Sequence, residues 1–235
     1  MSYASPQQAP VINLPESDRV AFMMKVYQHI AMAVGAFIAA EFLLFATGAA
    51  EGIYKTVSKG GGATWLLVLG VFMVGSWLAT QATADLDNPG RQYAGLFGQA
   101  ALYSLLFAPF LYYVFNVTDG GAADVWSAAI ITGIGFAGLS AVAWTTRRDL
   151  SFMRPLIMWG GVAALVLIIG AVIFGANLGT WFSVGMVALM GASILYSTQQ
   201  ILRTYPEQAY VAAAVQLFSS MMTMFWYILR IVSNR

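Results

Sequence analysis

Seven long apolar runs follow one another along this chain, separated by short polar loops. A helix needs about 20 apolar residues to cross the roughly 30 Å hydrocarbon core of a bilayer. In lipid, a helix also satisfies its own backbone hydrogen bonds, which an irregular segment does not. The runs therefore predict seven transmembrane helices, over residues 26–50, 63–81, 93–115, 126–144, 152–174, 178–202 and 209–232.

The composition agrees with this class of fold and excludes others. Hydrophobic residues make up 60% of the chain and charged residues only 9%, whereas soluble domains carry about 25% charged residues. A soluble enzyme, a disordered chain and a nucleic-acid binder that relies on basic phosphate contacts are thereby excluded. We expect an all-α integral membrane protein in contact with membrane lipid. A polar, mobile tail over residues 1–19 should precede one seven-helix domain over residues 20–235, with no appended soluble domain.

The distribution of Lys and Arg beside the spans predicts the orientation, because cytoplasmic loops carry an excess of these residues. With seven spans, seven cations fall on the side of the N-terminus and four on the opposite side. This favours a cytoplasmic N-terminus and a C-terminus across the membrane. A six-span arrangement with a re-entrant last segment is the alternative.

Small residues recur every four positions in the fourth span, at Ala129, Gly133, Ala137 and Ala141. Rows of this kind let helix backbones approach closely in lipid. We expect this row to pack inside the bundle, with a dimer interface as the alternative.

Uncharged polar side chains form one stripe on each of the last two spans. Residues spaced by three or four positions share one face of a helix, so each stripe should point into the bundle and toward the other. The stripes then either hydrogen-bond to each other or line a polar cavity. Their members are Ser193, Ser197 and Gln200 in the sixth span and Gln216, Ser220 and Thr223 in the seventh.

Glu41 is the one ionisable residue that lies deep within a predicted span. Because a charge at membrane depth is costly, such a residue is a functional candidate. Glu41 either takes part in ion or proton passage, and is then a further candidate for the polar cavity, or hydrogen-bonds a neighbouring helix as a neutral acid.

The residues that catalysis requires are missing. His29 is the only histidine, there is no cysteine, no aspartate lies inside a span and no lysine lies in the last span. A serine protease needs a histidine base, and none is placed to act on Ser140. We therefore predict no enzyme activity, no cofactor and no metal site.

Three segments carry a resemblance to a known family. The loop between the fourth and fifth spans resembles the most recognisable loop of the Bax inhibitor-1 family. It reads Thr145-Thr146-Arg147-Arg148-Asp149-Leu150-Ser151-Phe152. Leu195-Tyr196-Ser197-Thr198-Gln199 resembles the family's Leu-Tyr-Asp-Thr-Gln in the sixth helix. The stretch from Gln216 to Arg230 resembles its last helix.

The resemblance implies a seven-helix bundle with the last helix near its centre. Characterised members are proton-sensitive calcium leak pathways or modulators of cell death. The bacterial YccA branch, which this chain resembles most in its last helices, binds and restrains the membrane-anchored protease FtsH. The resemblance thus implies a bacterial inner-membrane protein with an FtsH-like protease as partner.

One departure from the family pattern bears on function. The leak members carry an aspartate in the sixth helix and another in the seventh, which share a proton; two close carboxylates suit this because each raises the other's pKa. The matching positions here are Ser197 and Ser220, which do not titrate. Our first hypothesis is a YccA-type regulator that binds membrane proteins. The alternatives are a calcium or other cation leak without this pH sensor, in which Glu41 is the buried carboxylate, and a structural subunit of a larger membrane complex.

The loop residues Arg147, Arg148 and Asp149 are candidates for contact with a partner on the cytoplasmic side. Alternatively, the two cations only set the topology, and Asp149 caps the fifth helix.

Overall fold

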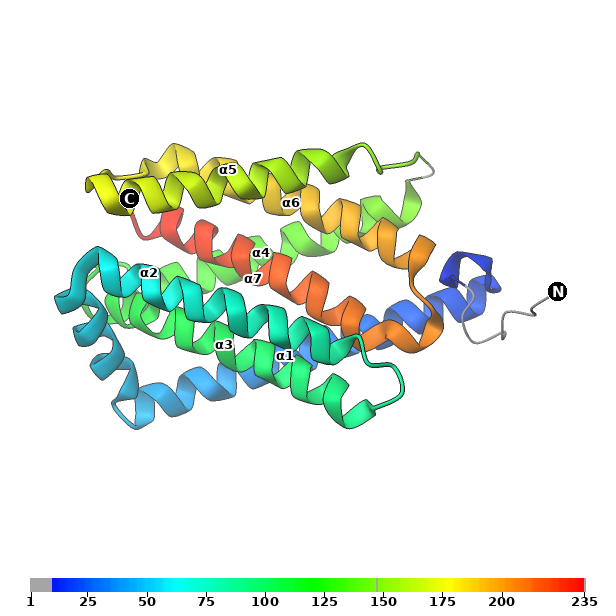
Figure 1. Ribbon diagram of the computed structural model, residues 1–235, viewed down its shortest axis with the longest axis horizontal. Helices are drawn as coiled ribbons and strands as arrows, with labels where there is room; N and C mark the ends of the chain where they lie inside the picture. The colour runs from blue at the N-terminus through cyan, green and yellow to red at the C-terminus, as the bar shows by residue number, and fades with distance from the viewer. Residues whose placement is uncertain (1–9, 147, 235) are drawn as a thin grey trace.

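The computed structural model describes residues 10–146 and 148–234. Within them, all seven predicted spans are helices long and apolar enough to cross a membrane, which confirms the fold class (Figure 1). The helices are α1 (Glu16–Ala46), α2 (Ala49–Thr83), α3 (Pro89–Asn116), α4 (Gly121–Thr145), α5 (Met153–Phe174), α6 (Gly179–Thr204) and α7 (Tyr210–Val232), with 3-10 turns η2 (Val11–Asn13) and η3 (Glu207–Ala209).

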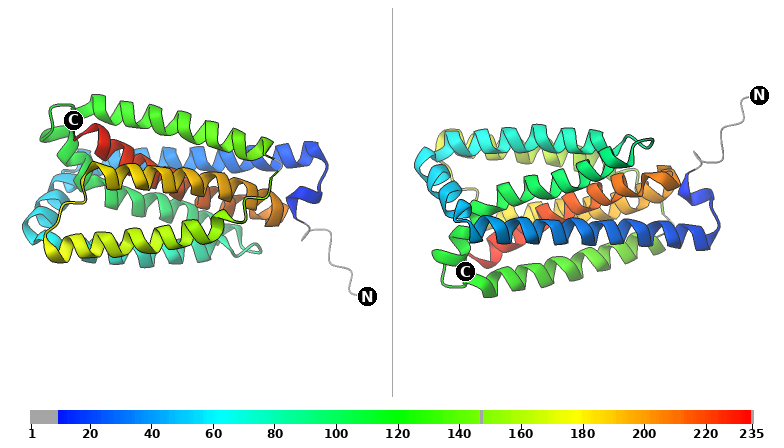
Figure 2. Two further views of the ribbon diagram at one scale, coloured as in Figure 1. Left: turned by 90° about the horizontal axis from the view of Figure 1, so that it is seen from above. Right: turned by 90° about the horizontal axis from the view of Figure 1, so that it is seen from below.

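Helix α7 forms the core of the bundle. It packs against α1, α2, α3, α4 and α6, and Figures 1 and 2 show it running between the other helices. Its side chains, such as Leu217, Phe218 and Leu229, are fully buried. The ring of Phe107 from α3 stacks on Phe225 and meets Trp226 edge-on. The central last helix that the family resemblance implied is therefore present.

The first helix begins earlier than predicted, at Glu16. Glu16 and Asp18 lie in its first turn, where negative side chains stabilise the helix dipole. The 31 residues of α1 span about 46 Å at 1.5 Å per residue, so its polar first turns extend beyond the hydrocarbon core.

Residues 10–19, expected to belong to a polar tail, are folded. Val11 is completely buried, and its N–H donates to the Tyr205 carbonyl oxygen over 2.9 Å. Pro10 forms an antiparallel bridge with Pro206. This segment covers the connection between α6 and α7, because an apolar side chain at position 11 gains more from burial there than from exposure. Residues 1–9 of the expected tail lie outside the described residues.

The second helix is interrupted near the predicted start of its span. Gly61 has φ 60° and ψ −150° inside α2, a backbone conformation that glycine adopts without steric cost. The chain turns there (Figure 1), so that residues 49–60 form a separate helical piece and the membrane span follows.

The small-residue row of α4 does not pack inside the bundle. Ala129, Gly133, Ala137 and Ala141 are all exposed, whereas a neighbouring row with the same spacing, from Ala128 to Ser140, is buried. Because α4 is apolar on every side, the spacing of its small residues alone does not distinguish the buried face from the lipid face.

Candidate functional site

The two polar stripes meet between α6 and α7 as a hydrogen-bonded seam. Ser193 Oγ lies 3.1 Å from Ser220 Oγ. Gln216 Nε2 donates to Ser197 Oγ over 3.0 Å, and Tyr205 Oη donates to Gln216 Oε1 over 2.7 Å. Ser197 and Ser220 are buried. The seam matches the first of the two arrangements expected for the stripes, which is hydrogen bonding between the helices.

The remaining members of the stripes lie outside the seam. Thr223 Oγ1 is 3.1 Å from Tyr103 Oη of α3, because position 223 faces α3 rather than α6. Gln200 accepts a hydrogen bond from Thr204 Oγ1 through its backbone carbonyl, and no side-chain bond joins it to the seam among the described residues.

Glu41 also stands apart from the seam. It lies on α1, one helical turn beyond Phe37, whose carbonyl accepts a hydrogen bond from Ser104 of α3. The Glu41 side chain is 7% exposed, and neither carboxyl oxygen has a hydrogen-bond partner among the described residues. The structure does not bring Glu41 together with the hydroxyl groups of α6 and α7.

A second polar cluster, which sequence reasoning missed, joins α2, α3 and α7. Gln99, fully buried in α3, donates from Nε2 to Ser76 Oγ over 2.9 Å and to Ser219 Oγ over 3.1 Å. Tyr103 Oη donates to the Ser219 carbonyl over 2.9 Å. The signal in the sequence was an amide in the middle of an apolar span, where a polar group needs a partner.

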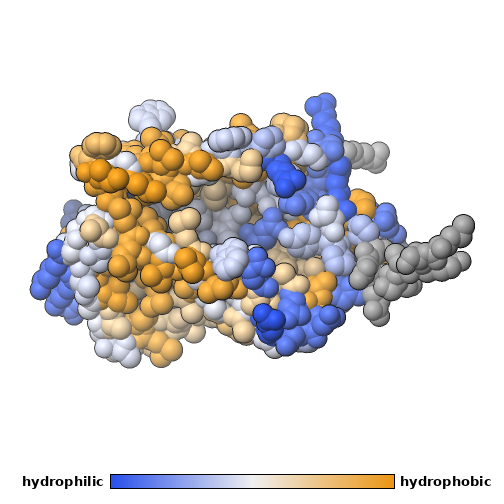
Figure 3. Space-filling view, viewed as in Figure 1, coloured by the Kyte–Doolittle hydropathy of each residue, from blue (hydrophilic) through white to orange (hydrophobic). Residues whose placement is uncertain are grey.

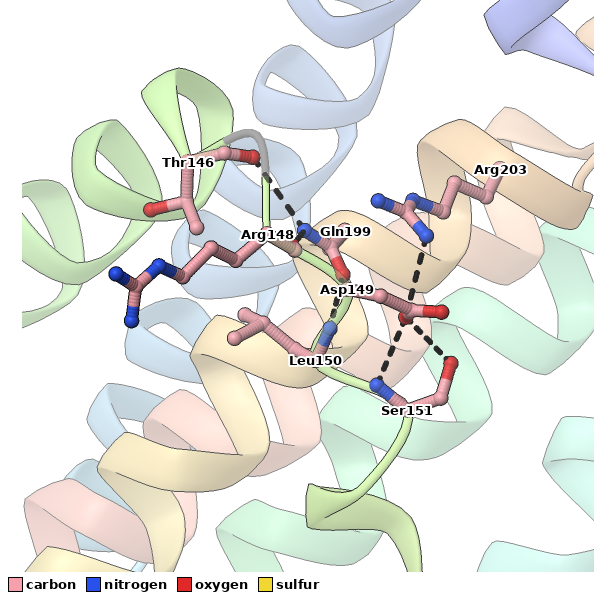
Figure 4. A network of polar contacts seen from close by, with 7 residues as sticks. All are labelled: Thr146, Arg148, Asp149, Leu150, Ser151, Gln199 and Arg203. Carbon is pink, nitrogen blue, oxygen red and sulfur yellow. Dashed lines mark hydrogen bonds and ion pairs between the residues drawn. The ribbon is translucent and has the colours of Figure 1, made fainter.

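The loop between α4 and α5 is held by a residue of α6 (Figure 4). Gln199 Nε2 donates to the Arg148 carbonyl over 2.7 Å, and Gln199 Oε1 accepts from the Leu150 N–H over 2.8 Å. A longer contact of 3.5 Å reaches the Thr146 carbonyl. Gln199 is buried. The loop motif and the sixth-helix motif of the sequence therefore meet in space.

Asp149 organises the exposed side of this loop. Its Oδ1 accepts from the Ser151 hydroxyl over 2.6 Å and from the Ser151 N–H over 2.9 Å, and it lies 3.1 Å from Arg203 Nη1. The hydrogen bonds from Ser151, with the nearby Arg203 charge, lower the pKa of Asp149. Asp149 does not cap α5 as expected: the N-cap position belongs to Phe152, and the carboxylate closes a tight turn before it.

Of the two cations predicted to contact a partner from this loop, the structure describes only Arg148. Arg148 is exposed, and its side chain points away from the network (Figure 4). Arg147 lies outside the described residues. Within the part of the chain that the structure describes, no three His, Cys, Asp or Glu side chains are grouped so that they could hold a metal ion.

Comparison with known proteins places this arrangement in a family. The family model described as "Inhibitor of apoptosis-promoting Bax1" matches residues 19–235. A protein of unknown function from Pseudomonas aeruginosa is 28% identical over 162 residues, which cover 68% of this chain and 72% of the relative. A Neisseria meningitidis protein of unknown function is 28% identical over 129 residues, 54% of this chain and 56% of its own length.

A Vibrio cholerae protein described only as a membrane protein is also similar to the chain. It is 28% identical over 103 residues, 43% of this chain and 46% of its own length. The family match covers α1 from residue 19, all of α2 to α7, the α6–α7 seam and the loop that Gln199 holds. The chain is therefore a member of the Bax inhibitor-1 family of helical membrane proteins.

Proposed function

We propose that this protein is a non-enzymatic membrane regulator that acts by binding another membrane protein, of the kind represented by the YccA branch. The observation that carries the proposal is the α6–α7 seam. Ser197 and Ser220, at the positions of the family's aspartate pair, hydrogen-bond to Gln216 and Ser193. A seam of paired neutral groups holds two helices together and has no group that titrates near neutral pH.

The loop 146–151 is the surface that we propose for contact with the partner. Gln199 fixes its backbone from inside the protein, while Arg148 is exposed. A loop that is already ordered loses little conformational entropy on binding. The resemblance to the YccA branch points to a membrane-anchored protease of the FtsH type as the partner.

Crosslinking in cells, followed by affinity purification in mild detergent and mass spectrometry, tests this proposal. We expect the FtsH-type protease to be recovered in stoichiometric amount. Arg148→Glu should lower its recovery several-fold, whereas Arg154→Glu, a matched change at an exposed cation at the start of α5, should not. Recovery of this protein alone after crosslinking would contradict the proposal. Equal recovery with both variants would remove the loop from it.

The same proposal includes a location in the bacterial inner membrane with a cytoplasmic N-terminus. The bacterial relatives support the location. The orientation agrees with the arrangement of the helices, because the start of α1 and the loop 146–151 lie at the same end of the bundle and the end of α7 lies at the opposite end (Figure 1). A C-terminal alkaline phosphatase fusion, active only outside the cytoplasm, should be active. If the phosphatase fusion is inactive and a separate fluorescent reporter fused to the C-terminus is fluorescent, the orientation is the opposite of the one proposed.

A cation leak is the second candidate function, and Glu41 is the observation that favours it. A buried carboxyl without a partner among the described residues is unusual for a purely structural role. Calcium flux into liposomes should then depend on Glu41, so Glu41→Gln should reduce it. Glu51→Gln, a matched change at the exposed carboxylate paired with Lys55, should not. The absence of flux above that of empty liposomes would eliminate this function.

A further inference from the structure

A cavity lies between α2 and α5, away from the seam and the loop. Its volume is about 760 Å³, within the range of roughly 300–1,000 Å³ that small-molecule sites occupy. Most of its wall is apolar, with Leu69 from α2, Phe107 from α3, Ile168 from α5 and Trp226 from α7. Figure 3 shows the corresponding hollow between α5 and α2. We call it the α2–α5 cleft.

The α2–α5 cleft runs from one end of the bundle toward its middle. On α2 its lining extends from Gly62 to Phe72, and on α7 from Thr223 to Arg230 and on to Asn234. At 1.5 Å per residue, the α2 segment is about 15 Å long. This is about half of the roughly 30 Å hydrocarbon core, so the cleft has the depth of one leaflet.

The two walls of the cleft belong to helices that face hydrocarbon. Val71 on α2 and Ile173 on α5 are 60% and 65% exposed, so the outer faces of both helices contact lipid. Water has few polar partners in an apolar cleft at this depth, and an ordered water needs two or more. Acyl chains are the abundant apolar material beside it.

Among the described residues that line the cleft, Arg230 is the one cation, and it lies at the interfacial end. Asn177 and Asn234 line the cleft beside it, and none of the described lining residues is acidic. Among the described residues, the Arg230 guanidinium forms no ion pair or hydrogen bond. A guanidinium offers a planar set of donors that matches a phosphate group, and the two amides supply further N–H donors.

We propose that the α2–α5 cleft is a binding site for one membrane phospholipid. One acyl chain lies in the apolar part between α2 and α5, and the phosphate group contacts Arg230, Asn177 and Asn234. A phospholipid satisfies two features together, which are the apolar depth of one leaflet and a cation that has no acidic partner among the described residues. The site is separate from the loop 146–151 and stands whether or not a protease partner is found.

Native mass spectrometry of the purified full-length protein tests the site. After delipidation, phosphatidylglycerol is added in parallel with a diacylglycerol that has the same chains and no phosphate. We expect one phosphatidylglycerol molecule to be retained and the diacylglycerol to be lost. Arg230→Gln should lower the phosphatidylglycerol occupancy about tenfold, whereas Arg154→Gln, at an interfacial cation on α5, should leave it unchanged. The proposal would be overturned if Arg230→Gln retained as much phosphatidylglycerol as the unaltered protein. It would also be overturned if the unaltered protein retained both lipids equally.

A second variant tests the apolar half of the site without touching the charge. Ala171 of α5 lines the cleft, so Ala171→Trp should fill it and displace the acyl chain. Ala163→Trp, on the exposed side of the same helix, is the matched control. A phospholipid with a photoreactive acyl chain should label peptides of α2, α5 and α7 in the unaltered protein and in Ala163→Trp, but not in Ala171→Trp. Labelling of α4 to the same extent as α2, α5 and α7 would contradict a defined site.

Discussion

Gln199 Nε2 donates a 2.7 Å hydrogen bond to the Arg148 carbonyl, while Gln199 Oε1 accepts one of 2.8 Å from the Leu150 N–H. One buried amide side chain therefore satisfies the backbone on both sides of Asp149. Because this loop lacks regular secondary structure, the amide takes the place of the neighbouring backbone that a helix would provide. The order of the loop depends on a residue about fifty positions away in the sequence.

Replacing Gln199 should release the loop. Gln199→Leu leaves the Arg148 carbonyl and the Leu150 N–H without partners, which costs about 1–3 kcal/mol when such groups stay buried. We expect a lower midpoint of thermal unfolding in detergent and faster trypsin cleavage within residues 146–151. Gln200→Leu, which changes the adjacent residue without touching the loop, is the control. Cleavage at the same rate in both variants would show that Gln199 does not hold the loop.

The turn around Asp149 should respond to acid. Its pKa is lowered in the folded protein by hydrogen bonds from Ser151 and by Arg203. A group with a lowered folded pKa contributes stability that is complete above its ordinary pKa and is lost as the pH falls through the folded value. Hydrogen exchange of the Ser151 amide, corrected for its intrinsic rate, should therefore lose protection below about pH 4.

Asp149→Asn is the control for this acid response. The amide side chain does not titrate, so protection of the Ser151 amide should no longer vary with pH in this range. A pH response that persists in Asp149→Asn would assign it to another group.

Ser193 and Ser220 should be coupled, but weakly. Interhelical hydrogen bonds in membranes average about 0.6 kcal/mol. In a double-mutant cycle with Ser193→Ala and Ser220→Ala, unfolding free energies should give a coupling of this size. The cycle of Ser193→Ala with Thr223→Ala, which lies outside the seam, should give none. A coupling above about 2 kcal/mol would mean that the pair belongs to a larger cooperative network.

Gly95 should be sensitive to a single added methyl group. A Cβ atom at this position would lie 2.5 Å from the Ala79 carbonyl oxygen and 2.6 Å from Thr83 Cγ2, so α2 and α3 would have to separate. Overpacking of this kind costs about 1–3 kcal/mol, and Gly95→Ala should lower the thermal midpoint. Gly98→Ala adds the same group where no atom lies within 4 Å. An equal rise of the midpoint in both variants would show only the higher helix propensity of alanine and no overpacking at position 95.

The pattern of apolar runs along the sequence predicted much of this fold, because a membrane span is a local property of the chain. The bounds of α5, α6 and α7 lie within about two residues of the predicted ones, a usual margin for helix ends. The stripes of α6 and α7 were also predicted to face each other, since a polar group on an apolar helix is more stable when it points into the bundle than when it points toward lipid. The start of α1 was missed because residues 16–19 and Lys25 are polar or charged, so the first turns of the helix do not form one apolar run.

The number of helices, their apolar character and the three segments that mark the family could all be predicted from local stretches of the chain. The packing of the whole bundle sets which equally apolar face of α4 is buried, which hydroxyl groups pair across α6 and α7, and that Gln199 meets the loop at Arg148. Helix formation in lipid depends on neighbouring residues along the chain. The pairing of side chains depends instead on the rotation and depth of each helix against all the others, which no single segment encodes.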